Sequence, residues 1–273
     1  MNKYGKAFTF IIIIVFIIGI TIIGNKTGGN DINSRTVTTA ISNLSNRKIG
    51  WGIKRVDNHE QPDLGAKNKE LIDKYKGIAM GNKEKKYVYL TFDEGYEAGY
   101  TPKILQVLKE NNVKATFFLT AHFVNTQENL VKEMIDSGHT IGNHTVNHKS
   151  MPDLTDEVVK EEVMNLHTAV YQKFGYEMKY IRPPKGEFSE RTIDITNGLG
   201  YKTVMWSFAY DDWDEGKQGR EEYAKKKIID NIHSGAVILL HGNSKDNTNV
   251  LDYCIKEMKN MGYEFKSLDE FVP

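Results

Sequence analysis

Three carboxylates lie within the stretch TFDEGYE, residues 91–97, at the end of a short apolar run. The run, Tyr87–Leu90, has the aromatic and branched side chains of a buried strand. Adjacent side chains of an extended backbone point to opposite sides, so Asp93 and Glu94 need not share a role. These acids could supply a metal ligand and a general base, or form a solvated loop that caps the next helix. The motif alone favours neither interpretation.

A second stretch, GNHTVNH at residues 142–148, places two histidines four residues apart. His144 and His148 could therefore reach one ion from a single helical turn or a tight loop. A carboxylate from another strand end would supply a third ligand, and an open fourth position would hold water, as in catalytic zinc sites. Taken alone, a pair at this spacing is more often two unrelated surface histidines.

Arg182 opens the stiff segment RPPKG, residues 182–186. Its planar guanidinium could pair with Asp93 and keep that acid ionised and oriented. A surface salt bridge in a proline-rich turn is the commoner meaning of such a segment by itself.

His241 ends the apolar run LLH, residues 239–241. A core histidine is the usual interpretation, but an imidazole near other polar strand ends suits general acid–base chemistry near neutral pH. Trp213, next to Asp212, could form an apolar or sugar-stacking wall, or simply pack in the core.

The elements that must position these side chains alternate between strand and helix from Lys86 onward. Regular alternation predicts a parallel sheet, and about seven units predict a barrel or an open doubly wound sheet. The candidate residues all fall at the carboxyl ends of expected strands, where barrel side chains converge on a ligand. The expected strands are 87–92, 115–120, 140–144, 180–183, 202–208, 236–241 and 263–266, and the expected helices are 102–111, 128–137, 156–174, 190–199, 221–234 and 247–261.

Five stretches in this order, TFDEGYE, GNHTVNH, RPPKGEF, YDDW and LLH, resemble the motifs of the carbohydrate esterase family 4 polysaccharide deacetylases, which share the NodB homology domain. The resemblance covers residues 86–271 and implies a distorted (β/α)7 barrel. A closer similarity is to the spore cortex branch, which deacetylates N-acetylmuramic acid on the way to muramic δ-lactam. That similarity rests on the Gly-Tyr-Glu after the first acids, on GYTPK at 99–103, on Trp51-Gly52 and on FKSLD at 265–269.

The resemblance also implies a role for each matching residue. Asp93 is similar to the catalytic base and His241 to the catalytic acid. The remaining matches are His144, His148 and Glu94 as ligands of a divalent metal, with zinc the expected ion; Arg182 as the partner of Asp93; Asp212 as the support of His241; and Tyr96, Pro183 and Trp213 as substrate contacts. Glu94 departs from the family pattern, which usually has a shorter aspartate there, so the position and preference of the metal could differ.

The implied activity is metal-dependent hydrolysis of an N-acetyl group in peptidoglycan. The implied partners are a glycan strand with peptide-free muramic acid and an N-acetylmuramoyl-L-alanine amidase that would prepare it. Two alternatives remain. A deacetylase of N-acetylglucosamine in peptidoglycan or chitin-like chains shares the same motifs, with Lys185 a candidate for telling the two sugars apart by the lactyl group. A wall-glycan-binding barrel without catalysis is the alternative outside enzymes.

Outside the motifs, the composition and the first residues of the chain limit the possible function classes and the cellular location of the protein. The formal net charge is +0, with 36 basic and 36 acidic residues, which gives no bias toward nucleic acid. The apolar run from Phe8 to Ile23 follows two lysines and lacks a small-x-small cleavage site, which favours a signal anchor over a cleaved signal peptide at residues 1–24.

Residues 25–85 are expected to be a polar tether and a packing segment, followed by the deacetylase domain at 86–273. The protein is thus expected outside the cytoplasm, membrane-anchored or secreted, with the spore envelope as a candidate location.

Overall fold

A computed structural model describes residues 44–273, and the predicted signal segment and the first part of the tether lie outside this range. The described residues belong to one compact unit. Within them, no helix has the length and apolar character that crossing a membrane requires. Residues on both sides of the boundary expected at residue 85 belong to this one unit. The boundary itself stays a prediction.

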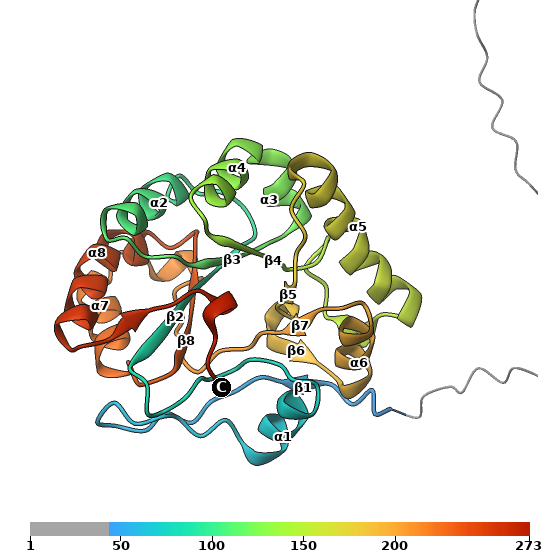
Figure 1. Ribbon diagram of the computed structural model, residues 1–273, viewed down its shortest axis with the longest axis horizontal. Coiled ribbons are helices and arrows are strands. Elements are labelled where there is room, and N and C mark those ends of the chain that lie inside the picture. The colour runs from blue at the N-terminus through green and yellow to red at the C-terminus, as the bar shows by residue number, and fades with distance from the viewer. Residues whose placement is uncertain (1–43) are drawn as a thin grey trace, which may run out of the picture. The chain divides into compact units, whose positions relative to one another are not determined.

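A curled parallel sheet forms the centre of the molecule (Figure 1). The neighbouring strands are, in order, β7 (Lys202–Thr203), β5 (Tyr180–Ile181), β4 (Thr140–Asn143), β3 (Thr116–Leu119), β2 (Tyr87–Glu94) and β8 (Ala236–His241), and β9 (Glu264–Phe265) pairs with the start of β2. The chain beyond β7 crosses the remaining gap, since Phe208 forms a parallel bridge with Ile238. The predicted α/β fold with a parallel sheet is confirmed, and the sheet is curled like a half-barrel.

Helices surround this sheet on its outer side (Figure 1). Their apolar faces bury valine, leucine and isoleucine against the strands, which is the usual packing of a parallel sheet. The helix α5 has the predicted bounds, beginning after the Thr155 cap and ending at Gly175 with φ 65°. The helices are α1 (Ala66–Lys74), α2 (Thr101–Glu110), α3 (Ala121–Thr126), α4 (Glu128–Asp136), α5 (Asp156–Phe174), α6 (Glu190–Gly198), α7 (Glu221–Asp230) and α8 (Lys245–Asn260).

The segment 44–85 packs on the sheet instead of standing apart from it. Its strand β1 (Ile49–Gly50) pairs antiparallel with β6 (Glu187–Phe188), directly after the RPPKG segment. The indole Nε1 of Trp51 donates a hydrogen bond to the carbonyl of Trp206 at 2.9 Å. This segment therefore supports the loop that carries Lys185.

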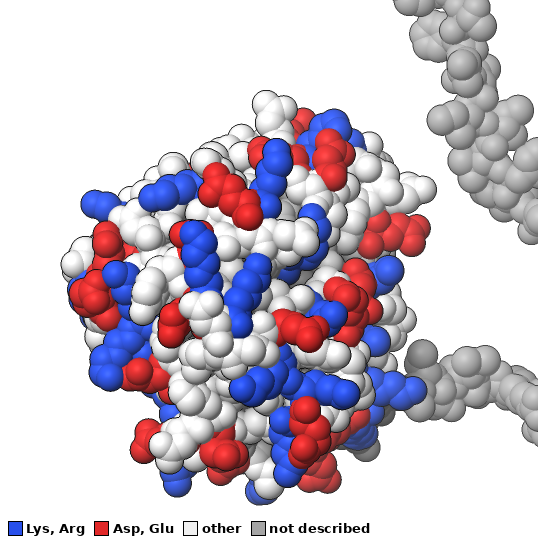
Figure 2. Space-filling view, turned by 60° about the vertical axis from the view of Figure 1, so that its left-hand side comes forward, with Lys and Arg blue, Asp and Glu red and all other residues white. Residues whose placement is uncertain are grey.

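Acidic and basic side chains alternate over the face shown in Figure 2, without a broad area of one sign there. This agrees with the balanced composition of the chain. On that face, therefore, the charge distribution is not that of a nucleic-acid-binding surface.

Candidate active site

A cavity of about 1170 Å³ lies at the carboxyl ends of the central strands. Six of the predicted site residues line it: Asp93, Tyr96, His144, His148, Trp213 and His241. They come from β2, from the end of β8 and from the loops that follow β2, β4 and β7. The expected convergence on one rim is therefore what the structure shows.

On one side of the cavity, Asp93 forms a buried ion pair with Arg182. The guanidinium Nη1 donates to Asp93 Oδ1 at 2.7 Å, and the Arg182 side chain is 0% exposed. Two further Arg182 nitrogens donate to the carbonyls of Val204 and Met205, each at 3.3 Å. Burial alone would raise the pKa of Asp93, but the charge and hydrogen bond of Arg182 together with the nearby His144 and His241 outweigh it and lower the pKa below its usual value. Asp93 is thus a carboxylate at neutral pH, as predicted.

The two histidines face each other across a tight turn after β4. Their Nε2 atoms are 3.1 Å apart. The turn is fixed by the side chain of Asn143, which accepts from the Thr145 amide at 2.8 Å, and by the Thr145 hydroxyl, which accepts from the His148 amide at 3.1 Å. Both Thr145 and His148 have positive φ, at 66° and 54°, so a local turn of the backbone brings the rings together.

The hydrogen bonding of His144 leaves its Nε2 with a free lone pair. Its Nδ1 lies 2.8 Å from the Arg182 carbonyl, which can only accept, so Nδ1 carries the proton of the neutral ring. Burial lowers the pKa of His144, and burial together with His144 lowers the pKa of His148 to about 4. Both rings are therefore neutral at pH 7, the form that binds metals.

Glu94 does not join the histidine pair, contrary to the prediction that it is the third ligand. The strand β2 continues through Glu94, so this side chain points to the opposite face from Asp93. Glu94 is 0% exposed, its Oε1 lies 3.4 Å from the Thr101 hydroxyl, and it does not line the cavity. Its carboxylate is packed so tightly on Gly242 that a Cβ added there would lie 2.1 Å from both oxygens. Burial, and then the charge of Glu97, raises its pKa well above the usual value.

Within residues 44–273, no set of three or more His, Cys, Asp or Glu side chains is arranged as a ready metal site. The rings of His144 and His148 nevertheless both line the cavity, with their Nε2 atoms close together. Asp93 Oδ2 lies 3.3 Å from His144 Nε2 and offers an oxygen close to them. Imidazoles suit a borderline divalent ion such as zinc, so His144 and His148 are the residues that could hold one.

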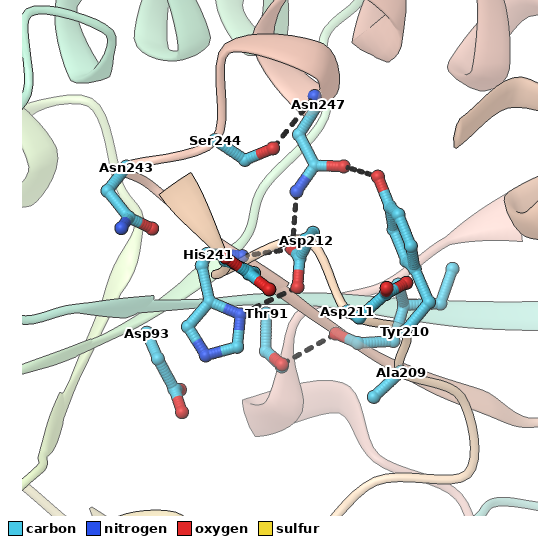
Figure 3. A network of polar contacts seen from close by, with 12 residues as sticks. Thr91, Asp93, Ala209, Tyr210, Asp211, Asp212, His241, Asn243, Ser244 and Asn247 are labelled. Carbon is cyan, nitrogen blue, oxygen red and sulfur yellow. Dashed lines mark hydrogen bonds and ion pairs between the residues drawn. The ribbon is translucent and has the colours of Figure 1, made fainter. Parts of the chain in front are cut away.

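On the other side of the cavity, Asp212 holds His241 (Figure 3). Asp212 Oδ1 lies 2.9 Å from the ring Nδ1, and its Oδ2 accepts from the His241 amide at 2.8 Å. Burial alone would lower the pKa of His241, but the charge and hydrogen bond of Asp212 outweigh it and raise the pKa. Asp212 thus contacts His241 in the way its predicted supporting role requires, and the arrangement favours a protonated imidazole with its Nε2 available.

Sequence reasoning missed Asn247, which completes this side of the site. Its Nδ2 donates to Asp212 Oδ2 at 2.5 Å, and its own oxygen accepts from the Tyr210 hydroxyl (Figure 3). Asn247 lies in the first turn of α8, three residues after the Ser244 N-cap. The spacing of Ser244 and Asn247 signals a helix start, but nothing local to it reveals a contact 35 residues away in the chain.

The predicted substrate contacts separate into two groups. Tyr96 and Trp213 line the cavity and are 39% and 58% exposed, so their rings are available to a sugar. The Tyr96 hydroxyl contacts Glu215 and accepts from Asn243 Nδ2 at 3.0 Å. Pro183 is buried and does not line the cavity, whereas Lys185 and Gly186 of the same segment do. Pro183 therefore shapes the loop and does not reach the cavity.

Comparison with known proteins identifies the family. The sequence pattern described as polysaccharide deacetylase matches residues 80–204. The peptidoglycan-N-acetylmuramic acid deacetylase PdaA of Bacillus subtilis is 45% identical over 230 residues, which cover 84% of this chain and 88% of that protein. The chain belongs to the polysaccharide deacetylase family. It is a hydrolase of N-acetyl amide bonds, as the motifs predicted.

A solved structure of PdaA and one further relative place the chain within the family. The solved structure of Bacillus subtilis PdaA, described as a family 4 carbohydrate esterase, matches with a TM-score of 0.81 and 44% identity, covering 84% of this chain and 98% of that one. A peptidoglycan-N-acetylglucosamine deacetylase of Bacillus cereus is 33% identical over 201 residues, 72% of each chain. Relatives therefore include proteins named for each of the two sugars.

Proposed function

We propose that this protein removes the acetyl group from N-acetylmuramic acid in peptidoglycan. The observation that carries the proposal is the pairing of an ionised Asp93 with a proton-bearing His241 in one cavity. The choice of sugar is supported by the 45% identity to the muramic acid deacetylase PdaA, against 33% for the glucosamine deacetylase.

Hydrolysis needs a base for water and an acid for the leaving amine. Asp93 Oδ1 is occupied by Arg182, and its Oδ2 accepts a proton from the attacking water. The new C–O bond forms at the acetyl carbonyl as the C–N bond breaks. His241 gives the proton of its Nε2 to the departing nitrogen, and Asp212 stabilises the charged ring before that transfer. The products are acetate and a free amino sugar.

A divalent metal, in our proposal zinc, would be bound by His144 and His148 and would supply Lewis-acid activation of the water and the amide carbonyl. The residues themselves contribute orientation. The Arg182 carbonyl fixes the His144 ring through Nδ1, and the same residue fixes Asp93 through its guanidinium. Arg182 thus positions both a metal ligand and the base.

The wider setting extends the same proposal. The free amine of muramic acid can attack the lactyl carboxyl and close a δ-lactam, provided that an amidase has first removed the peptide. The predicted signal anchor would place the domain outside the membrane, on the side of the wall, and a role in the spore cortex follows from the lactam. The apolar run at Phe8–Ile23 and the branch resemblance support these points.

Acetate release by residues 44–273 tests the proposal. The substrates are peptide-free N-acetylmuramic acid glycan, the same glycan with its peptides, and an N-acetylglucosamine oligomer, each with added zinc and with chelator. We expect metal-dependent release from the first substrate and little from the others. Release mainly from the glucosamine oligomer would keep the chemistry but replace the substrate. Absence of release from all three, with the protein folded and metal-loaded, would favour a wall-binding barrel.

A further inference from the structure

The cavity contains one long cation. Lys185 is the only lysine or arginine lining it among residues 44–273. The other basic side chains on the wall are the shorter imidazoles of His122, His144, His148 and His241, of which His241 is held by Asp212. Lysine is charged at pH 7. A negatively charged group on the substrate therefore has Lys185 as its principal partner in the cavity.

The backbone presents Lys185 from a fixed point. It lies in the short 3₁₀ turn Pro184–Gly186 with φ 60° and ψ 7°, a left-handed conformation that the preceding proline and the surrounding packing hold in place. The Gly186 carbonyl accepts from the Trp51 amide at 2.8 Å. A Cβ added at Gly186 would come 2.7 Å from the Trp206 ring, so the turn is packed directly onto that ring.

The acids near Lys185 already have other partners. Lys48 lies 2.6 Å from Asp153 and 3.4 Å from Glu187, the two carboxylates beside the turn. On the cavity wall, Asp93 is paired with Arg182 and Glu215 contacts the Tyr96 hydroxyl. Across the described residues, the ammonium of Lys185 has no carboxylate within ion-pair distance, although the side chain is exposed toward the cavity. A solvated surface lysine is the alternative, but it does not account for the rigid turn that places this one on the cavity wall.

We propose that Lys185 binds the free lactyl carboxylate of N-acetylmuramic acid and selects substrate by that charge. This inference rests on the proposed function. Muramic acid differs from glucosamine by a lactyl ether on O3, whose carboxyl is an anion when the peptide is absent and an uncharged amide when the peptide is attached. A lysine on the cavity wall can therefore distinguish the peptide-free sugar from both alternatives.

The test compares Lys185→Gln and Lys185→Arg with the control Lys149→Gln. Lys149 is also exposed and directly follows His148, but it does not line the cavity, so its substitution makes the same charge change near the site. Each variant is assayed on peptide-free N-acetylmuramic acid glycan and on the same glycan with the lactyl carboxyl converted to a primary amide. Thermal unfolding confirms that the turn tolerates glutamine.

For Lys185→Gln we expect KM on the acid substrate to rise about five- to tenfold with kcat nearly unchanged, since an ion pair with ligand is worth about that much. The amide substrate should show no change, Lys185→Arg should restore most of the affinity, and Lys149→Gln should act like the wild type. An equal loss on both substrates would show a structural role and overturn the inference. An unchanged preference of Lys185→Gln for the acid substrate over the amide substrate would also overturn the inference, but it would leave the proposed function intact. A wild-type protein inactive on both muramic acid substrates but active on the glucosamine oligomer would refute the proposed function itself.

Discussion

Asp93 and Asp212 both contact a basic side chain at the rim of the same sheet, but only Asp93 keeps a carboxylate oxygen for the cavity. Asp93 uses Oδ1 for Arg182 and directs Oδ2 toward the cavity, 3.3 Å from His144 Nε2. Asp212 uses both oxygens, one for the His241 ring and the other for the His241 amide and Asn247. Its side chain is 0% exposed. One aspartate can therefore take a proton from water, whereas the other acts only through its histidine.

The partner also decides which protonation state results. Arg182 is a permanent cation, and with the nearby histidines it lowers the pKa of Asp93 although this side chain is buried. His241 can lose its proton, so the charge of Asp212 instead raises the pKa of that ring. The same residue type thus helps to produce a base on one side and an acid on the other. The comparison can be tested by substituting each aspartate and its supports in turn.

The largest effect is expected from Asp93→Asn. Asparagine can still accept from Arg182, so the fold should persist, but it cannot take a proton from water. We expect kcat to fall by about 10²- to 10⁴-fold, the usual contribution of a general base. The measurement is the initial rate of acetate release, with bound metal and circular dichroism as controls. Activity above a tenth of the wild-type rate would remove Asp93 from the role of base.

A smaller effect is expected from Asp212→Asn. Removal of the charge leaves burial as the largest influence on His241, which lowers its pKa. A smaller fraction of the ring then carries a proton at pH 7.5, and we expect the rate there to fall about tenfold or more. The falling limb of the pH–rate profile should move to lower pH, and by more than in Asp93→Asn, because Asp212 raises the pKa of His241 more than Asp93 does. A limb that stays in place in Asp212→Asn would contradict the assignment.

Asn247→Leu should have a severalfold effect. It removes one donor from Asp212 and leaves the Tyr210 hydroxyl without its acceptor, at a cost typical of a buried unpaired polar group. We expect kcat to fall about three- to tenfold with KM unchanged, and Tyr210→Phe to give a smaller loss. Asn249→Leu, on the exposed side of the same helix, is the matched control. Equal losses in Asn247→Leu and Asn249→Leu would mean a general effect on the helix.

The smallest effect on catalysis is expected from Glu94→Gln. Because burial raises the pKa of Glu94 well above its usual value, the uncharged form is favoured there, and glutamine has nearly the same shape as that form. Rate and bound metal should stay within about twofold of the wild type, since the side chain faces Gly242 and not the histidines. Elemental analysis after gel filtration measures the metal. Loss of metal in this variant would restore Glu94 as a ligand.

Much of this architecture could be predicted from local signals. The helix α5 has the predicted bounds because a Thr cap and a left-handed glycine mark its two ends. The residue types raised the pairing of Arg182 with Asp93 and the family resemblance implied it, although the proline-rich segment alone favoured a surface salt bridge. The end of β7 was not predicted, because after two residues the chain leaves this strand and crosses toward β8.

The errors in the site have one physical source, which is that side-chain direction depends on where a strand ends. The sequence suggested an end at residue 92, but β2 continues through Glu94 and pairs it with Leu119 of β3. Strict alternation then directs Glu94 into the interior. Asn247 was missed for a related reason: its contact with Asp212 depends on how α8 packs, which no local pattern encodes.

The pH dependence of kcat/KM for the metal-saturated protein on peptide-free N-acetylmuramic acid glycan tests the central claim most directly. The proposed mechanism needs an ionised Asp93 and a protonated His241. Activity should therefore rise through a pKa below 3.8, within the range where the fold survives, and fall through a pKa above 6.5. A profile that instead rises through pH 6.5 and stays high would mean that His241 works unprotonated, and would contradict the assignment of acid and base.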